Sequence, residues 1–335
     1  MDVTTVADDE VVLHDGVVVR RHTGLAPDTD HLLDGEAVRT LPRPRGERLA
    51  TVCTVNDVHY GEVECGHLDG LEGGPIYRSE PGAEPYPVLM NRGAIADMAA
   101  IEPDAVVVKG DLTSMGTKAE YQDFLDAYEP AFGERLLHVR GNHDAYHGER
   151  FASDAPVARH LRGVTLALID TSIPYKASGG VSTDTLDWLD QLASEADRPV
   201  LVFGHHHPWN PGSADRPEGY FGINPDDSER LVALVARRPR IAGYFAGHTH
   251  RNRVRHFAPT GQVPWVEVAC VKDFPGAWAE YRVFEGGILQ VFRRISAPDA
   301  LAWSEKTRDM YGGLYADYAF GEIADRCFTI PARVG

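Results

Sequence analysis

Five short segments of this chain each end in a cluster of aspartate, asparagine and histidine residues. The segments are rich in β-branched residues, which is typical of strands buried on both faces of a sheet. The clusters that follow them are Asn56-Asp57-Val58-His59, Gly110-Asp111, Gly141-Asn142-His143-Asp144, Gly204-His205-His206-His207-Pro208 and Gly247-His248-Thr249-His250. In an open α/β sheet the carboxyl ends of the strands border one crevice. The clustered side chains are therefore predicted to converge, and this constrains the fold more than any other feature.

Amphipathic helical segments alternate with these strands. The predicted strands are Ala50–Val55, Ala105–Val108, Leu136–Val139, Val164–Ile169, Val200–Phe203, Ile241–Phe245 and Val266–Val271. The predicted helices are Val88–Ile101, Thr117–Phe132, Thr183–Ala196 and Ser228–Arg237. Strands that alternate with helices indicate a layered α/β domain.

The chain is predicted to have three parts. Residues 1–46 are expected to form a small β extension and a linker, in which His14-Asp15-Gly16 is a hairpin turn signal between two apolar runs. Gly24–His31 is similar to the G-L-x-P-x-T-x-Y stretch of fibronectin type III-like modules, with His31 in place of the tyrosine. Residues 47–296 form the main domain. Residues 297–335 are a tail that we expect to pack on the domain or on a partner subunit.

The main domain contains a Gly/Pro-rich insertion at residues 61–87. This stretch is too long for an ordinary loop between a strand and a helix. Because it directly follows His59, we expect it to shape a substrate pocket or act as a lid.

Composition limits the partners and the location of the protein. The 33 basic and 50 acidic residues give a net charge of −17, which disfavours nucleic acid as a bulk partner. No apolar run reaches the roughly 18 residues of a membrane span. The start is acidic rather than signal-like, and the four cysteines form no CxxC pair, which predicts a cytoplasmic protein. The oligomeric state, including a homo-oligomer, stays open.

The polar clusters together supply two carboxylates, one amide oxygen and at least four imidazoles, without a thiolate. This donor set suits Mn, Fe, Zn or Co and exceeds the needs of one ion. Two ions that share a bridging carboxylate explain the count, and such a pair activates water for attack on a phosphate ester. The site would be positive within an acidic protein, which favours a small phosphate ester over a long polyanion.

The ordered series D-x-H, G-D, G-N-H-D, H-x-P and G-H-x-H resembles the calcineurin-like metallophosphoesterases over roughly Arg48 to Arg294. The resemblance implies a four-layer α/β/β/α sandwich with a binuclear metal site. It implies that the first metal is held by Asp57, His59 and His250, that Asp111 bridges, and that the second is held by Asn142, His206 and His248.

The resemblance also implies that His143 stays free of metal and acts as a general acid or stabilises the transition state, with Asp144 able to orient it. The alternative is a structural histidine bonded to Asp144. Asn142, His143 and His207 are the candidates for substrate binding.

In the run His205-His206-His207, two residues remain candidates for the metal ligand. Counting back from Pro208 selects His206, which we favour, whereas counting forward from Gly204 selects His205. If the strand continued, alternation would place the two imidazoles on opposite sides, so only one is expected to reach the metal.

Differences between this sequence and other branches of the family narrow the branch that it resembles. Ser114 stands where purple acid phosphatases have a tyrosine, and Gly110–Gly116 lacks the arginine of the protein Ser/Thr phosphatases. The motifs look most like the bacterial cyclic-nucleotide and glycerophosphodiester phosphodiesterases. We therefore expect a phosphodiesterase for small phosphodiesters. The alternatives are a phosphomonoesterase or nucleotidase of the same fold, a non-catalytic metal-binding scaffold, and a nuclease, which the net charge argues against.

Overall fold

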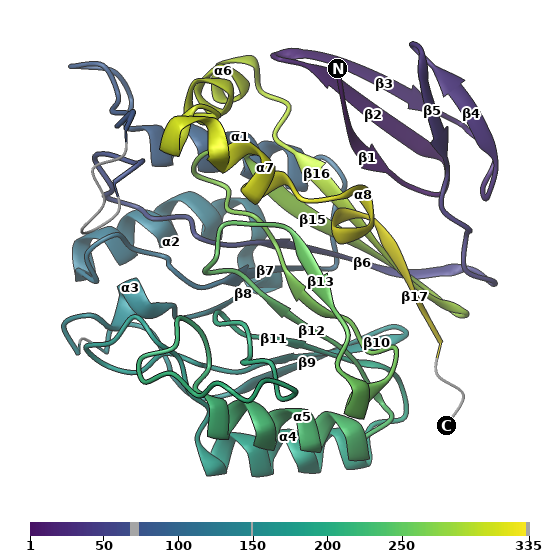
Figure 1. The fold of residues 1–335 in the computed structure, drawn as a ribbon, viewed down its shortest axis with the longest axis vertical. Coiled ribbons are helices and arrows are strands. Elements are labelled where there is room, and N and C mark those ends of the chain that lie inside the picture. Colours follow the sequence, from purple (N-terminus) through teal and green to yellow (C-terminus); the bar gives the residue numbers. More distant parts are fainter. Residues whose placement is uncertain (68–73, 149, 333–335) are drawn as a thin grey trace.

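Two six-stranded sheets lie face to face in the computed structural model, which describes residues 1–67, 74–148 and 150–332 (Figure 1). The first sheet has the order β17 (Phe328–Pro331), β16 (Gly287–Arg294), β15 (Ala277–Phe284), β6 (Arg48–Val55), β7 (Ala105–Lys109) and β8 (Leu136–Val139). The second has the order β13 (Arg253–Arg255), β14 (Trp265–Glu267), β12 (Ile241–Ala246), β11 (Val200–Phe203), β10 (Val164–Leu168) and β9 (Val157–Leu161).

Helices cover the outer face of each sheet. The first sheet is covered by α1 (Tyr86–Ala99) and α2 (Lys118–Phe132), and the second by α4 (Thr183–Glu195) and α5 (Pro225–Arg237) (Figure 1). Apolar side chains from both sheets, such as Val52, Val107, Leu201 and Phe203, form a buried cluster between them. The four-layer α/β/β/α sandwich is therefore confirmed.

Local sequence signals explain where the helices begin. Thr117 accepts a hydrogen bond from the Glu120 amide, and the Glu120 carboxylate accepts one from the Thr117 amide, which is a capping box. Ser182 and Asn224 cap α4 and α5 by accepting from the backbone amides of Thr185 and Asp227. Each cap satisfies an amide that the helix itself leaves unpaired.

The predicted strands agree with the structure in place and type, with one clear difference. The predicted strand Val266–Val271 ends at Glu267. After that residue the chain crosses to the other sheet, where the Val271 amide donates to the Asn56 carbonyl over 3.2 Å. This crossing brings residues 268–273 next to the end of β6.

The hairpin β15–β16 was not predicted. Its strands carry Glu280, Arg282, Arg293 and Arg294, which in a single sequence indicate a solvent-exposed face. All four are buried in the structure, because the N-terminal segment and the C-terminal helices cover them.

The N-terminal segment forms two small sheets. The strands β1 (Asp2–Val6), β2 (Glu10–Asp15) and β3 (Val18–Thr23) make one sheet, and β4 (Asp30–Leu33) pairs with β5 (Glu36–Arg39). The predicted hairpin is confirmed, with Asp15 opposite Val18. Val6, Val11 and Leu13 pack against Phe292 of β16, so this segment lies on the first sheet.

The C-terminal segment returns to the main domain. It contains α6 (Pro298–Thr307), a 3-10 turn at Met310–Gly313, α7 (Leu314–Phe320) and α8 (Ile323–Arg326). The main domain has two further 3-10 turns, at Gly133–Arg135 and Ala258–Thr260. Trp303 and Tyr315 join the core beneath α1, and β17 pairs with β16. The segment is thus part of both the helical layer and the sheet.

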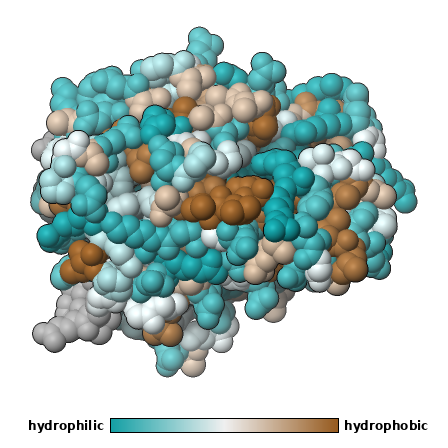
Figure 2. Space-filling view, turned by 90° about the horizontal axis from the view of Figure 1, so that it is seen from above, coloured by the Kyte–Doolittle hydropathy of each residue, from teal (hydrophilic) through white to brown (hydrophobic). Residues whose placement is uncertain are grey.

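The surface in Figure 2 is mainly hydrophilic, with apolar residues in separate groups. Within the described residues, no helix is long and apolar enough to cross a membrane.

Candidate metal centre

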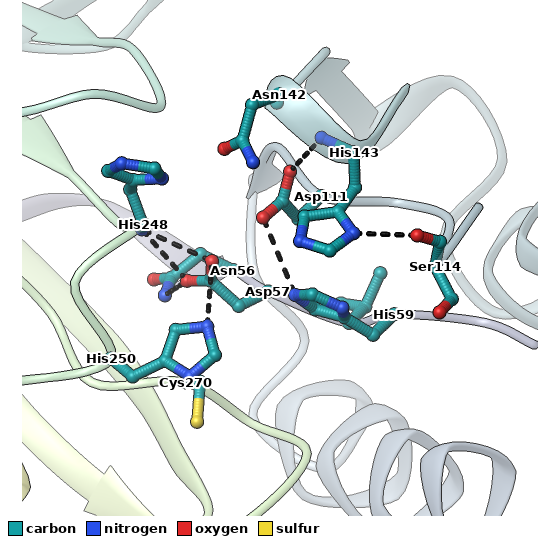
Figure 3. A network of polar contacts seen from close by, with 12 residues as sticks. Asn56, Asp57, His59, Asp111, Ser114, Asn142, His143, His248, His250 and Cys270 are labelled. Carbon is teal, nitrogen blue, oxygen red and sulfur yellow. Dashed lines mark hydrogen bonds and ion pairs between the residues drawn. The ribbon is translucent and has the colours of Figure 1, made fainter. Parts of the chain in front are cut away.

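Five of the predicted ligands have a left-handed backbone conformation. The φ angles are 54° at Asp57, 47° at His59, 49° at Asp111, 69° at His248 and 54° at His250. Such a conformation costs a non-glycine residue about 1–3 kcal/mol and is concentrated at functional sites. The strained turns lie just after the ends of β6, β7 and β12, where the side chains meet (Figure 3).

One side of the site is formed by Asp57, His59, Asp111 and His250. The Nε2 atom of His250 lies 3.4 Å from an oxygen of Asp57, and Nε2 of His59 lies 3.4 Å from an oxygen of Asp111. Possible ligand atoms of Asp57, His59 and His250 are all within 4.8 Å of one another. The structure thus brings together the residues expected to hold the first metal and the expected bridge.

The other side is formed by Asn142, His205 and His248. The Nε2 atom of His205 lies 3.2 Å from an oxygen of Asp111, 3.1 Å from Oδ1 of Asn142 and 4.0 Å from Asp57. Its Nδ1 donates to the Lys109 carbonyl over 2.8 Å, which fixes the ring. His205 therefore faces both carboxylates.

The close approach of His205 depends on a glycine. A Cβ atom at Gly110 would lie 2.5 Å from Nδ1 of His205, so a larger residue there would displace the imidazole. Gly110 thus makes room for His205, which is the histidine selected by counting forward from Gly204.

His206 lies beside His205 and His248, and its Nε2 is buried without a hydrogen-bond partner among the described residues. Nδ1 of His206 pairs with Oγ1 of Thr171 at 2.9 Å, and its ring centroid is 4.4 Å from that of His248. Nε2 of His207 pairs with the Tyr220 hydroxyl at 2.9 Å. Ligand atoms of both His205 and His206 lie within 4.8 Å of one on His248, because β11 ends at Phe203 and strand alternation stops there.

His143 lies beside the first group, on the short helix α3 (Asn142–Ala145). Its Nδ1 donates to the Ser114 carbonyl over 2.6 Å, and its ring centroid lies 4.5 Å from that of His59. Figure 3 shows the ring next to Asp111 and His59. The backbone carbonyl of Ser114 is thus the group that orients the imidazole.

Asp144 has a different position from the one expected. Its buried carboxylate accepts hydrogen bonds from the amides of Leu112, Thr113 and Gly141 and from the Thr113 hydroxyl. These bonds tie the loop after β7 to the loop after β8. The contact with His143 that we expected from Asp144 is made by the Ser114 carbonyl instead.

Burial and mutual charges shift the ionisation of the site. Burial opposes the charge on Asp57, but the neighbouring His250 outweighs it and lowers the pKa of Asp57 to about 2. Burial likewise opposes the charge on Asp111, while His205 and His143 hold its pKa well below the usual range. Burial lowers the pKa of both His206 and His248, which keeps these imidazoles neutral. Burial also opposes the charge on His205 and His250, but Asp111 raises the pKa of His205 to about 9, and Cys270 and Asp57 raise that of His250 above its usual range. Because metal binds carboxylate anions and neutral imidazoles, His205 and His250 would release a proton when metal binds.

The residues present fit divalent transition metals. The donors are carboxylate, amide and imidazole groups, which suit Mn, Fe and Zn. Nε2 of His248 is buried and has no hydrogen-bond partner within the described residues. A buried imidazole nitrogen without a partner is costly unless it binds something from outside the chain.

Sequence reasoning missed several residues around these ligands. Cys270 and Asp273 have possible ligand atoms within 4.8 Å of one on His250, and Glu62 lies 3.9 Å from Nδ1 of His59. Cys270 and Asp273 follow no recognisable motif, because the chain reaches the site there by crossing between sheets. Glu62 lies in the predicted insertion at residues 61–87, of which residues 68–73 lie outside the described residues.

Comparison with known proteins points to one family. Residues 50–252 match the family model of the calcineurin-like phosphoesterases. The chain is 35% identical over 161 residues to the glycerophosphodiester phosphodiesterase GpdQ of Enterobacter lignolyticus, covering 44% of this chain and 56% of the relative. It is 31% identical over 168 residues to a cAMP/cGMP dual specificity phosphodiesterase of Mycobacterium tuberculosis, covering 46% and 51%. The matched region thus spans a little over half the length of these relatives.

Among solved structures, a dimetal phosphatase from Danio rerio superposes with a TM-score of 0.54 and 15% identity. The superposition covers 74% of this chain and 97% of that one. At this identity the likeness concerns the fold.

Proposed function

Because this chain belongs to the calcineurin-like phosphoesterase family, we propose that it hydrolyses small phosphodiesters with two divalent transition-metal ions (Mn, Fe or Zn). The observation that carries the proposal is the convergence of Asp57, Asp111, Asn142 and the surrounding imidazoles in one buried site. The names of the relatives support a diester, either a glycerophosphodiester or a cyclic nucleotide.

We assign the ligands by proximity. Asp57, His59 and His250 hold the first ion, and Asp111 lies between the two groups and bridges. To the second ion we assign Asn142, His205 and His248. We choose His205 over His206 because Nε2 of His205 faces Asp111 and Asn142. When bound, the ions supply an activated water and neutralise charge on the phosphoryl oxygens.

His143 provides the proton transfer in this proposal. With its Nδ1 hydrogen donated to the Ser114 carbonyl, Nε2 is the nitrogen left to carry a proton to the leaving oxygen. Asp144 keeps the two loops that carry Asp111 and His143 in register. His207 is held by Tyr220, and we propose that it borders the substrate rather than binding metal.

The charge and the cysteines complete the proposal. The net charge of −17 favours a small phosphate ester over nucleic acid. The four cysteines are free and buried, which fits a reducing cytoplasm.

The test compares a diester with its monoester. Protein reconstituted with Mn²⁺ is assayed with bis(p-nitrophenyl) phosphate and p-nitrophenyl phosphate, with and without EDTA. We expect kcat/KM to be higher for the diester and turnover to be lost in EDTA. Preference for the monoester would favour the phosphomonoesterase alternative. Bound metal without turnover of either substrate would favour the scaffold.

The ligand in the histidine run is tested by two variants. His205→Ala is expected to weaken binding of the second metal by orders of magnitude because it removes a ligand, whereas His206→Ala leaves the metal bound with a milder loss of turnover. Metal titration of both apo-proteins decides this, and the reverse order of affinities would select His206.

A further inference from the structure

A chain of buried polar side chains lies behind the ligands assigned to the first metal. We call it the outer network, and it consists of Glu62, Cys270, Lys272, Asp273 and Tyr315. Cys270, Lys272, Asp273 and Tyr315 are each at most 4% exposed. None of these residues belongs to the motifs that identify the family, and the inference below rests on the proposed metal site.

One end of the outer network is at His250. The Nε2 atom of this histidine faces Asp57, and Figure 3 shows Cys270 on the other side of the ring. The Cys270 thiol donates to Oδ1 of Asp273 over 2.7 Å, and the Tyr315 hydroxyl donates to the same oxygen over 2.6 Å. Two donors therefore fix the carboxylate next to the histidine.

The other end of the outer network is at His59. Its Nε2 faces Asp111, and its Nδ1 lies 3.9 Å from Oε2 of Glu62. Lys272 joins the two ends, because its Nζ lies 2.7 Å from Glu62 and 3.4 Å from Oδ2 of Asp273. The outer network thus connects the outer sides of two ligands of one metal.

The outer network is assembled from distant parts of the chain. Tyr315 comes from α7 in the C-terminal segment, whose Trp303 also donates from Nε1 to the Lys272 carbonyl over 3.0 Å. The Tyr318 hydroxyl donates to the carbonyl of Thr249, which lies between His248 and His250. The C-terminal segment therefore closes the back of the metal site.

We propose that the outer network is a positioning device for the first metal, and that the C-terminal segment completes this site by supplying Tyr315. A carboxylate or equivalent group behind a metal-binding histidine orients the ring and raises its basicity, and its loss costs about 10–100-fold in metal affinity. The second-metal ligands Asn142 and His205 have other partners and do not depend on the outer network.

The test measures metal affinity without relying on turnover. Asp273→Asn and Tyr315→Phe are made in the full chain, with Tyr311→Phe as the matched control, because Tyr311 packs edge-on against Tyr315 in the same segment. A second set carries Asn142→Ala, which removes a ligand of the second metal only, so that the remaining ion reports the first site. Each apo-protein is titrated with Mn²⁺ by calorimetry.

We expect Tyr315→Phe and Asp273→Asn to weaken the first metal by about 10–100-fold, with the second metal and the Tyr311→Phe control unchanged. The visible absorption of the Co²⁺-substituted protein should also change in Asp273→Asn, since the field at His250 changes. If Asp273→Asn does not fold, Tyr315→Phe decides.

Wild-type affinity in both variants, or an equal loss at both sites, would overturn the inference. Failure of the wild type to bind two ions would instead overturn the proposed function.

Discussion

The molecule holds two buried clusters of charged residues that differ in how their charges are balanced. In the metal centre, Asp57 and Asp111 lie among imidazoles on a strained backbone, and His248 keeps an unpartnered nitrogen. The other cluster, here the ionic cluster, lies between the N-terminal segment and the first sheet. It consists of Asp8, Glu10, Glu280, Arg282 and Arg293.

Every charged group of the ionic cluster has an oppositely charged partner within the chain. Glu280 accepts hydrogen bonds from Arg282 over 2.9 Å and from Arg293 over 2.6 Å. Arg293 also donates to Glu10 over 2.7 Å, and Arg282 to Asp8 over 2.6 Å. A buried charge cluster with complete internal pairing acts within the fold, whereas one with unpartnered nitrogens and strained turns is built to bind something else.

The largest expected effect is at the bridge of the metal centre. Asp111→Ala should abolish diester turnover, because both ions share this carboxylate in our proposal. The far-UV spectrum and thermal unfolding of the metal-free variant should stay close to those of the metal-free wild type. Retention of substantial turnover would show that Asp111 is not shared.

Loss of the proton-transfer group should have the next largest effect. His143→Ala should keep its metal but lose turnover by about 10²–10⁴-fold, the usual contribution of a general acid. The loss should be severe for diesters with poor leaving groups and slight for nitrophenyl esters. An equally small loss for both substrates would assign His143 a structural role.

In the ionic cluster the effect should fall on stability. Glu280→Ala removes the carboxylate shared by two buried guanidinium groups and leaves them only Asp8 and Glu10, which should lower the free energy of unfolding by about 3–5 kcal/mol. Metal content should not change. The control is Arg20→Ala, which removes an exposed ion pair with Asp34 and should change the free energy of unfolding far less. Urea denaturation of both variants measures the two changes in unfolding free energy. Loss of metal in Glu280→Ala would show that the ionic cluster and the metal centre are not independent.

The ionic cluster should also make the protein sensitive to acid. Burial opposes the charge on Glu280, but Arg293 and Arg282 outweigh it and lower its pKa from 4.5 to about 2. This shift corresponds to about 3 kcal/mol of stability, present above pH 4.5 and lost as the pH falls toward 2.

A histidine outside the ionic cluster adds to the acid sensitivity. Burial lowers the pKa of His14 to about 4, so the contribution of His14 to stability is complete above pH 6.5 and is lost toward pH 4.

Urea denaturation at pH 7, 5 and 3 measures this loss. In Glu280→Gln the unfolding free energy should depend less on pH below 4.5. The pH dependence between 6.5 and 4, which we assign to His14, should remain. An unfolding free energy of the wild type that is constant from pH 7 to pH 3 would contradict both assignments.

The two clusters also differ in how far the sequence predicts them. The predicted ligands of the metal centre follow strand ends, so local patterns such as Gly247-His248-Thr249-His250 predict which side chains come together, although they do not choose between His205 and His206. Asp8 and Glu10 accept from Arg282 and Arg293, which lie 274 and 283 positions away. Tyr315 donates to Asp273 from 42 positions away, so no local pattern shows these contacts. The position of Asp144 was missed because three backbone amides compete for its carboxylate.

The count of bound metal tests the central claim most directly. Protein purified without chelator is analysed for transition metals by elemental analysis, with the protein concentration measured independently. Close to two ions per chain are expected in the wild type and close to none in Asp111→Ala. One ion or none in the wild type, or two in Asp111→Ala, would contradict a binuclear centre bridged by this carboxylate.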